Sequence, residues 1–387
     1  MALAASASSR GHRLLLPLLR CHLSTTAAAV PRLPVDPALL RRLARARRFS
    51  DIEALLEPLK SSAAPSLSPS PEPLLAGVIA AYSAAGMLDH ARRTLAELPS
   101  LGSPRTAISL NALLHPLNRS PRLSPRVPSL LAELSSAHSL SPDQASYGIL
   151  VKSLCLSPGG AASALPVLAQ MAERGVPASA VIYTTILDSF YKERRPADAE
   201  RVWNEMLAKG LAPDLPAYNV RAMHRALHGN PEQVLALLKE MQSLGLNPDT
   251  ITYNYLIASY CAHGRFGEAM RVYKGLEEKG CAPNHATYKN LLASLCKNEE
   301  FELGLEVFDD GVKRGKVPDL GTVRILVEGL MRAGKVRAAK RAVTGLRKKF
   351  PEDFTGEWKS LEKVVGLSKD GGGGSDPAAG TAAAAAA

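Results

Sequence analysis

The sequence predicts an all-α fold, an α-solenoid of about eight to nine two-helix repeats, and three regular spacings lead to this prediction. Tyrosines recur at intervals of 36, 35, 35 and 35 residues, at Tyr147, Tyr183, Tyr218, Tyr253 and Tyr288. Glycines keep the same interval at Gly175, Gly210, Gly245, Gly280 and Gly315, and prolines do so at Pro177, Pro213, Pro248, Pro283 and Pro318. A fixed period of roughly 20–50 residues is typical of stacked repeats and not of one globular core.

The period from Thr250 to Asn284 predicts two helices. Its first half places apolar side chains at the i, i+3, i+4, i+7 and i+8 positions of a helix, at Tyr253, Leu256, Ile257, Tyr260 and Cys261. Gly264 ends this helix, and a second apolar stripe follows at Phe266, Ala269, Met270, Tyr273 and Leu276. Gly280 caps the second helix and Pro283 prevents its continuation. One such pair is too small to bury its own apolar face, so neighbouring pairs must stack.

This unit resembles the pentatricopeptide repeat, in the run ITYNYLIASYCAHGRFGEAMRVYKGLEEKGCAPN. The resemblance implies a right-handed superhelix and the plain P-type subclass of this family, as found in plant organelles. With Thr250 as position one, eight units cover residues 72–354, and a degenerate ninth covers 33–67. The other units are Glu72–Thr106, Ala107–Asp143, Gln144–Ser179, Ala180–Asp214, Leu215–Asp249, His285–Asp319 and Leu320–Phe354. The segment His115–Pro128 is an insert in the second of these units, and the last unit lacks the tyrosine and the closing Gly-x-x-Pro.

The two ends of the chain differ from the repeats in composition. Residues 1–35 contain four arginines, no lysine and no acidic residue, which predicts an organellar transit peptide over 1–30. The leader favours the mitochondrion, with the chloroplast as the alternative, and no apolar run reaches the ~18–20 residues of a membrane span. At the other end, we expect a capping helix over 355–367 and a disordered Gly- and Ala-rich tail over 368–387.

Catalysis and metal binding are not expected. Cys155, Cys261 and Cys296 share position twelve of their units, which favours packing over ligation, and no CxxC pair occurs. His224 and His228 lie four residues apart but lack the glutamate of a zincin motif. The chain carries no deaminase signature, phosphate-binding loop or G-x-S-x-G elbow. Paired acids such as Asp309–Asp310 are interpreted as solvating charge, so we expect no cofactor, no small-molecule substrate and a binding protein rather than an enzyme.

Basic residues predict contacts with phosphate. The net charge is +11, and the run Lys335–Lys349 near the C-terminus holds seven bases and no acid. Such clusters attract nucleic acid through counterion release, although basic residues on a helix are also an ordinary solvated face. The candidate phosphate contacts are Lys192, Lys297, Lys340, Arg341, Arg347, Lys348 and Lys349. A second basic cluster, Arg41 to Arg48, lies near the N-terminus.

The family resemblance also implies base-reading residues, with one base read per repeat at positions five and thirty-five. Uracil readers are implied at Asn111 with Asp143 and at Asn219 with Asp249; a guanine reader at Thr184 with Asp214; and a pyrimidine reader at Asn254 with Asn284. Position two flanks the base, and Val181 and Ile251 fit this role. Four of the eight units match no reading pair, which favours either a sequence-tolerant RNA binder or a scaffold.

Two functions remain open from the sequence. The first is post-transcriptional RNA metabolism or translation in mitochondria, with single-stranded RNA in the concave groove of the solenoid. The alternative is an accessory protein of the small subunit of the mitochondrial ribosome that contacts rRNA and ribosomal proteins. Short arrays with a start like RRFSDIEALLE and a terminal W-x-x-L helix look similar to such ribosomal proteins.

Overall fold

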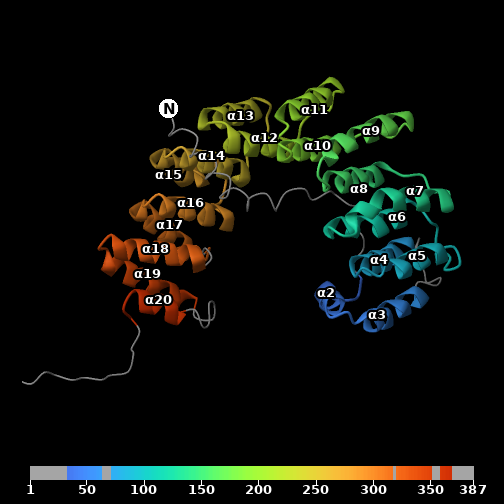
Figure 1. Cartoon of the computed structure of the whole chain (residues 1–387), viewed down its shortest axis with the longest axis horizontal. Helices are drawn as coiled ribbons and strands as arrows, with labels where there is room; N and C mark the ends of the chain where they lie inside the picture. Colours follow the sequence, from blue (N-terminus) through green and yellow to red (C-terminus); the bar gives the residue numbers. More distant parts are fainter. Residues whose placement is uncertain (1–32, 63–70, 317–319, 351–357, 368–387) are drawn as a thin grey trace, which may run out of the picture. The chain divides into compact units, whose positions relative to one another are not determined.

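The structure is a computed structural model that describes residues 33–62, 71–316, 320–350 and 358–367. It confirms the all-α prediction: within these ranges the chain forms helices and no strand (Figure 1). The proposed leader at 1–30 and the tail at 368–387 lie outside the described residues, as do 63–67 of the ninth unit and 351–357 around the expected capping helix. In the described ranges, no helix has the length and apolarity needed to cross a membrane.

The helices follow one another as hairpins, each with a first and a second helix. The first helices are α2 (Pro37–Arg45), α4 (Glu72–Ala84), α6 (Ala107–Leu114), α8 (Gln144–Cys155), α10 (Ala180–Lys192), α12 (Leu215–His228), α14 (Thr250–Ala262), α16 (His285–Lys297) and α18 (Leu320–Arg332). The second helices are α3 (Phe49–Ser62), α5 (Leu88–Glu97), α7 (Val127–Ala137), α9 (Gly160–Glu173), α11 (Pro196–Ala208), α13 (Pro231–Ser243), α15 (Phe266–Lys274), α17 (Phe301–Lys313) and α19 (Val336–Lys349). A short helix, α20 (Trp358–Val364), follows the last pair.

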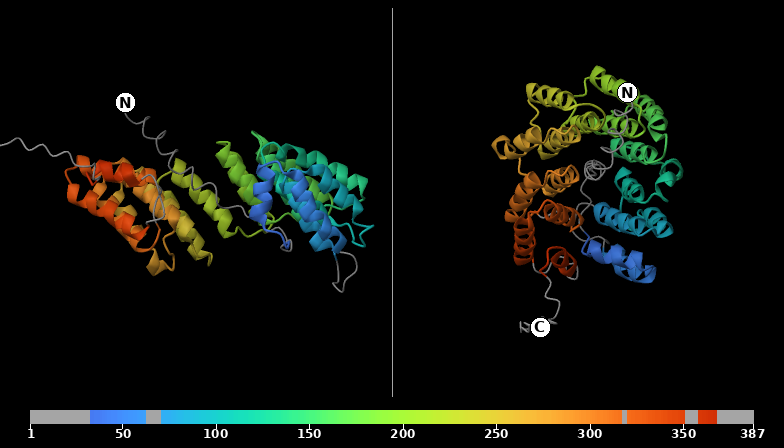
Figure 2. Two further views of the ribbon diagram at one scale, coloured as in Figure 1. Left: turned by 90° about the horizontal axis from the view of Figure 1, so that it is seen from below. Right: turned by 60° about the vertical axis from the view of Figure 1, so that its left-hand side comes forward.

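Contacts divide the chain into two compact units. Among the described residues, the N-terminal unit comprises 33–224 and 239–247, and the C-terminal unit comprises 225–238 and 248–367. Within the N-terminal unit, α4, α6, α8 and α10 pack side by side as a layer of first helices, with the second helices against it (Figure 2). Within the C-terminal unit, α14, α16 and α18 form the corresponding layer, and α20 packs on α18 and α19.

The periodic tyrosines join the two helices of a hairpin. Tyr183 and Tyr218 are almost fully buried, and each hydroxyl donates a hydrogen bond to a glutamate 22 residues further on, in the second helix. The two O···O distances are 3.0 Å to Glu205 and 2.9 Å to Glu240. Each tyrosine therefore contributes apolar burial from its ring and a polar tie from its hydroxyl.

Asp310 makes the same tie in the C-terminal unit, which corrects its interpretation as solvating charge. Its carboxylate accepts hydrogen bonds from Tyr288, 22 residues earlier, and from Tyr273 of the preceding hairpin, and Arg314 donates to it as well. Burial alone would raise the pKa of Asp310, but the hydrogen bonds from Tyr273, Arg314 and Tyr288 outweigh it and hold the pKa below its ordinary value. The carboxylate is a structural tie both within a hairpin and between hairpins.

In several repeats, the turn between the first and second helix has a left-handed residue at position fifteen. Gly264 occupies this position with φ 71°, as the sequence predicted. In two other repeats the same position is taken by residues with side chains, Arg194 with φ 59° and Glu299 with φ 64°. A side chain at such a φ is strained, because its Cβ approaches the backbone.

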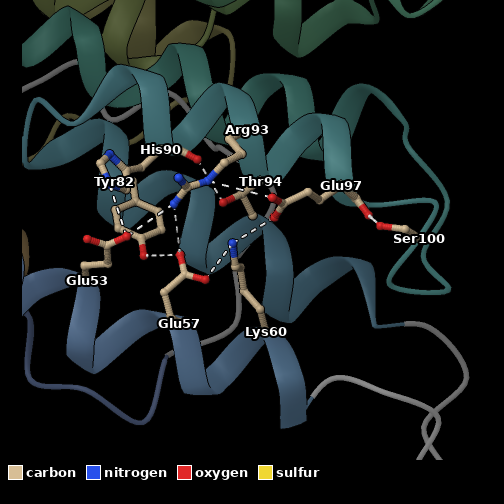
Figure 3. A network of polar contacts seen from close by, with 9 residues as sticks. All are labelled: Glu53, Glu57, Lys60, Tyr82, His90, Arg93, Thr94, Glu97 and Ser100. Carbon is tan, nitrogen blue, oxygen red and sulfur yellow. Dashed lines mark hydrogen bonds and ion pairs between the residues drawn. The ribbon is translucent and has the colours of Figure 1, made fainter.

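The first hairpin is fastened to the second by a polar network (Figure 3). Lys60 of α3 is nearly buried, and its ammonium lies 2.9 Å from Glu57 and 2.8 Å from Glu97 of α5. Tyr82 of α4 donates to the same Glu57. Burial acts to raise the pKa of Glu57, but hydrogen bonds from Lys60 and Tyr82 hold it below the ordinary value. The described part of the degenerate first repeat, residues 33–62, is thus packed as part of the helical array.

Position fifteen offers a test of the turn geometry. We expect Glu299→Gly to raise the free energy of unfolding by about 1 kcal/mol, because glycine relieves the left-handed strain. Gly264→Ala should lower the free energy of unfolding by a similar amount. Chemical denaturation of both variants measures the effect, and equal signs for the two substitutions would contradict the assignment.

Candidate nucleic-acid interface

The implied reading residues occupy two fixed places in the hairpins. Position five is the fifth residue of a first helix, and it is occupied by Asn111, Thr184, Asn219 and Asn254 on α6, α10, α12 and α14. Position thirty-five directly precedes the next first helix. This residue is also the N-cap of that helix, so its side chain is in part engaged with backbone amides. This second role was not predicted from the sequence.

The pair Asn111 and Asp143 is in direct contact. Asn111 Nδ2 donates to Asp143 Oδ1 at 3.0 Å, and the same oxygen accepts from the backbone amide of Ser146 at 2.8 Å. The Ser146 hydroxyl lies 2.6 Å from Asn111 Oδ1 and 2.9 Å from Asp143 Oδ1. Both ends of the Asn111 amide are therefore engaged within the protein.

The charge of Asp143 is stabilised by this arrangement. Burial acts to raise its pKa, but hydrogen bonds from Asn111 and Ser146 outweigh burial and hold the pKa below the ordinary value. At neutral pH the carboxylate is ionised and can only accept hydrogen bonds. It can orient the Asn111 amide, whose NH₂ group faces it.

The pair Asn254 and Asn284 is less completely hydrogen-bonded. Asn254 Nδ2 lies 3.5 Å from Asn284 Oδ1, at the limit of a hydrogen bond. Asn284 Oδ1 accepts from the backbone amide of Thr287 at 3.0 Å and so caps α16. Asn254 Oδ1 is buried and has no hydrogen-bond partner among the described residues. A buried carbonyl oxygen without a donor is uncommon, and a ligand N–H would satisfy it.

The other two pairs are closely packed. Thr184 is 1% exposed, and its hydroxyl donates to the carbonyl of Ala180 at 2.8 Å. Asp214 Oδ1 accepts from the amide of Ala217 at 2.9 Å and starts α12. Asn219 is also nearly buried, and it belongs to the N-terminal unit while Asp249 belongs to the C-terminal unit and caps α14. Asn254 is only 4% exposed, so base contact at the buried positions requires neighbouring side chains to move apart.

The apolar flanking position lies one helical turn before the reading position. Val181 and Ile251 are half-buried on α10 and α14, three residues before Thr184 and Asn254. The sequence analysis missed Ile108, which stands three residues before Asn111 on α6 and is 45% exposed. The signal was available, because Ile108 is position two of its unit.

The candidate phosphate contacts differ in how much of their charge is already paired. Lys192 forms an ion pair with Asp188, Arg341 with Asp309, and Arg347 with Glu362. Lys349 donates to two carbonyls at the end of α17, and Lys297 also has an interaction. Within the described residues, Lys340 and Lys348 form no ion pair. These two, with the exposed Arg337, belong to α19, whose sequence contains no acidic residue.

The described histidine and cysteine side chains are packed within the helical array. The His224 ring stacks on Tyr191 with centroids 4.1 Å apart, and no group of three potential ligands gathers within the described residues. Burial raises the pKa of Cys261 to about 11 and that of Cys296 to about 12, which keeps both thiols protonated. Cys155, at the same position of its unit, is only partly buried.

Comparison with known proteins identifies the repeats. The profile of the PPR repeat family matches residues 178–220 and 248–297, and the PPR repeat profile matches 226–246 and 286–315. Between residues 178 and 315, the repeats of this chain therefore match pentatricopeptide repeats, apart from short gaps. The fold agrees with the crystal structure of the maize pentatricopeptide repeat protein PPR10, with a TM-score of 0.50 and 22% identity over 81% of this chain and 47% of that one. At this identity, the similarity shows the fold alone.

Two relatives from Arabidopsis thaliana share 201-residue segments with this chain. One is named small ribosomal subunit protein mL103 (rPPR7) and is 41% identical over 52% of this chain and 47% of its own length. The other is named a mitochondrial pentatricopeptide repeat-containing protein and is 40% identical over 52% of this chain and 46% of its own length. The matched part of this chain spans about half the length of each relative.

Asp143→Asn tests the charge of the reading pair. Asparagine keeps the N-cap acceptor but removes the charge, so we expect a loss of about 1 kcal/mol in unfolding free energy at pH 7. Because the folded-state pKa lies below the ordinary value of 3.8, this difference is fully present above that pH and disappears as the pH falls through the folded-state pKa. Denaturation curves of both proteins between pH 7 and pH 2 measure the difference, and a gap that does not change with pH would contradict it.

Proposed function

We propose that this protein binds single-stranded RNA through its first helices and acts in mitochondrial RNA metabolism or translation. The observation that carries the proposal is Asn254 Oδ1, a buried acceptor without a partner among the described residues, beside Asn284 at a base-reading position. A nucleobase N–H or amino group supplies the missing donor. The half-buried Ile251, one turn away, provides an apolar surface for the base plane.

Backbone contacts add affinity that does not depend on sequence. Arg337, Lys340 and Lys348 form no ion pair within the described residues and lie on the acid-free helix α19. Lysine and arginine charges of this kind displace counterions from RNA phosphates. The remaining candidates, Lys192, Arg341 and Arg347, must exchange an existing carboxylate partner for phosphate, so their contribution is smaller.

The expected sequence specificity is low. Four base-reading pairs distinguish 4⁴, or roughly 250, RNA sequences. This number is too small to select one site in a transcriptome. The engaged amide of Asn111 and the close packing of Thr184 reduce this number further. We propose that the chain is a binding protein of the P-type subclass and not an enzyme.

A ribosomal role is the second candidate function. It is favoured by the relative named small ribosomal subunit protein mL103, and by two further relatives named small ribosomal subunit proteins mS79 and mS78, 36% and 34% identical over 116 residues. In that role the same residues contact rRNA within the small subunit, and ribosomal proteins are additional partners. Low base specificity suits a fixed position in an assembly.

Sedimentation of mitochondrial extract separates the two roles. Migration with the small subunit that persists after nuclease treatment of exposed RNA supports the ribosomal role. A light complex that dissolves on nuclease treatment supports a separate RNA-binding role. Absence of the protein from mitochondria would contradict both.

Asn254→Ala tests base reading. We expect one pyrimidine-selective position to disappear from RNAs selected out of a randomised pool, with about a tenfold loss of discrimination at that nucleotide. Asn111→Ala is the matched control, since the amide that it removes is already engaged with Asp143 and Ser146. Unchanged selectivity in Asn254→Ala, or an equal effect in the two variants, would contradict the role given to Asn254.

A further inference from the structure

The insert between α6 and α7 is an ordered part of the structure and differs from the turns of the other repeats. It forms two short 3-10 helices, η2 (His115–Arg119) and η3 (Ser124–Arg126), in place of a simple turn. Leu117 and Val127 are fully buried, so the segment is packed at both ends. Four prolines, at positions 116, 121, 125 and 128, restrict its backbone further.

Hydrogen bonds fasten the insert to the next repeat. Asn118 Nδ2 donates to the carbonyl of Ile149 on α8 at 3.0 Å, and the Ser124 hydroxyl donates to Asn118 Oδ1 at 3.2 Å. Ser153, also on α8, donates to the carbonyl of Ser124 at 2.7 Å. The insert also packs on α4 and α6, so it contacts three neighbouring first helices. It therefore lies beside the layer that carries the proposed reading positions.

The insert presents a concentrated positive charge. Arg119, Arg122 and Arg126 are all exposed, and none forms an ion pair with a described residue. From Leu98 to Ala132 the sequence contains no acidic residue at all. Burial lowers the pKa of nearby His115, and the charge of Arg119 lowers it further. Two other exposed arginines at turns are paired, Arg195 with Asp198 and Arg265 with Glu232.

We propose that this arginine insert is a second RNA contact, which holds the phosphate backbone beside the bases read by the first helices. This proposal rests on the RNA-binding function proposed above. Arginine presents a planar fork of donors that matches phosphate oxygens, and its charge does not titrate. Because the segment is already ordered, little conformational entropy is lost when RNA binds. Three unpaired guanidinium groups within eight residues form a site that an RNA backbone can occupy without displacing an internal carboxylate.

The test uses the full chain with all three arginines replaced, R119Q/R122Q/R126Q, and labelled single-stranded RNAs of poly(U) and mixed sequence. We expect binding at 0.1 M salt to weaken about tenfold for every RNA alike, and the slope of log K against log salt to become shallower by about two. The charge-matched control K239Q/R271Q/K313Q changes three exposed bases on second helices and should leave both quantities near the wild-type values. Melting curves show whether the variants fold.

A second variant separates position from bulk charge. Asn118→Ala removes the tie to Ile149 but keeps all three arginines, so it should weaken binding less than the triple variant, without changing the net charge. Equal RNA affinity of the triple variant and its control would overturn the proposal while leaving the RNA-binding function intact. Unchanged RNA binding with loss of binding to polyglutamate would overturn it in favour of an acidic protein partner. Failure of the wild-type chain to bind any RNA would overturn the proposed function itself.

Discussion

In three repeats, a hydrogen bond between a buried tyrosine and a carboxylate on the partner helix holds the hairpin together. Tyr183, Tyr218 and Tyr288 each reach an acid 22 residues later. Without that acceptor, the buried hydroxyl would carry a desolvation cost of about 1–3 kcal/mol. With it, the tyrosine fixes the distance between the two helices of the hairpin, and hairpins of equal thickness can stack in a regular array. The regular stacking brings the N-cap of one repeat next to the reading position of the preceding one, as Asp143 and Asn111 show.

Much of the fold could be predicted from the sequence because the repeat period is a strong signal. The turn at Gly264 and the apolar faces of α14 and α15 follow directly from residue type and spacing. The carboxylate partners were missed because an acid on a second helix looks like ordinary surface charge. A recurring acid 22 residues after the tyrosine, at Glu205, Glu240 and Asp310, was the signal that could have found them. The left-handed turns at Arg194 and Glu299 could not be predicted from side-chain chemistry, since only glycine marks such a position.

The positions of the candidate site residues could be predicted from the sequence, but their hydrogen bonding and exposure could not. Residue spacing placed Asn254 and Asn284 at neighbouring points of adjacent repeats, and the structure brings them within 3.5 Å. Residue spacing could not show that Asn111 is engaged by Ser146. Nor could it show that Asn254 Oδ1 lacks a partner among the described residues, because both depend on side-chain orientation. The exposure of these side chains could not be predicted from the sequence either, because it is set by the packing of adjacent first helices. The structure of the insert also lay beyond sequence reasoning, because its order comes from contacts with α8 that no local pattern encodes.

Position thirty-five is both an N-cap and a reading position, and this limits how the protein can change its ligand preference. Asp143, Asp249 and Asn284 each begin a helix as well as standing at a reading position. Only a few side chains start helices well, chiefly Ser, Thr, Asp and Asn. Only a few residue types can therefore replace one another at position thirty-five, and any other residue would destabilise the hairpin that follows. New recognition properties would arise mainly through position five, where no helix start restricts the choice.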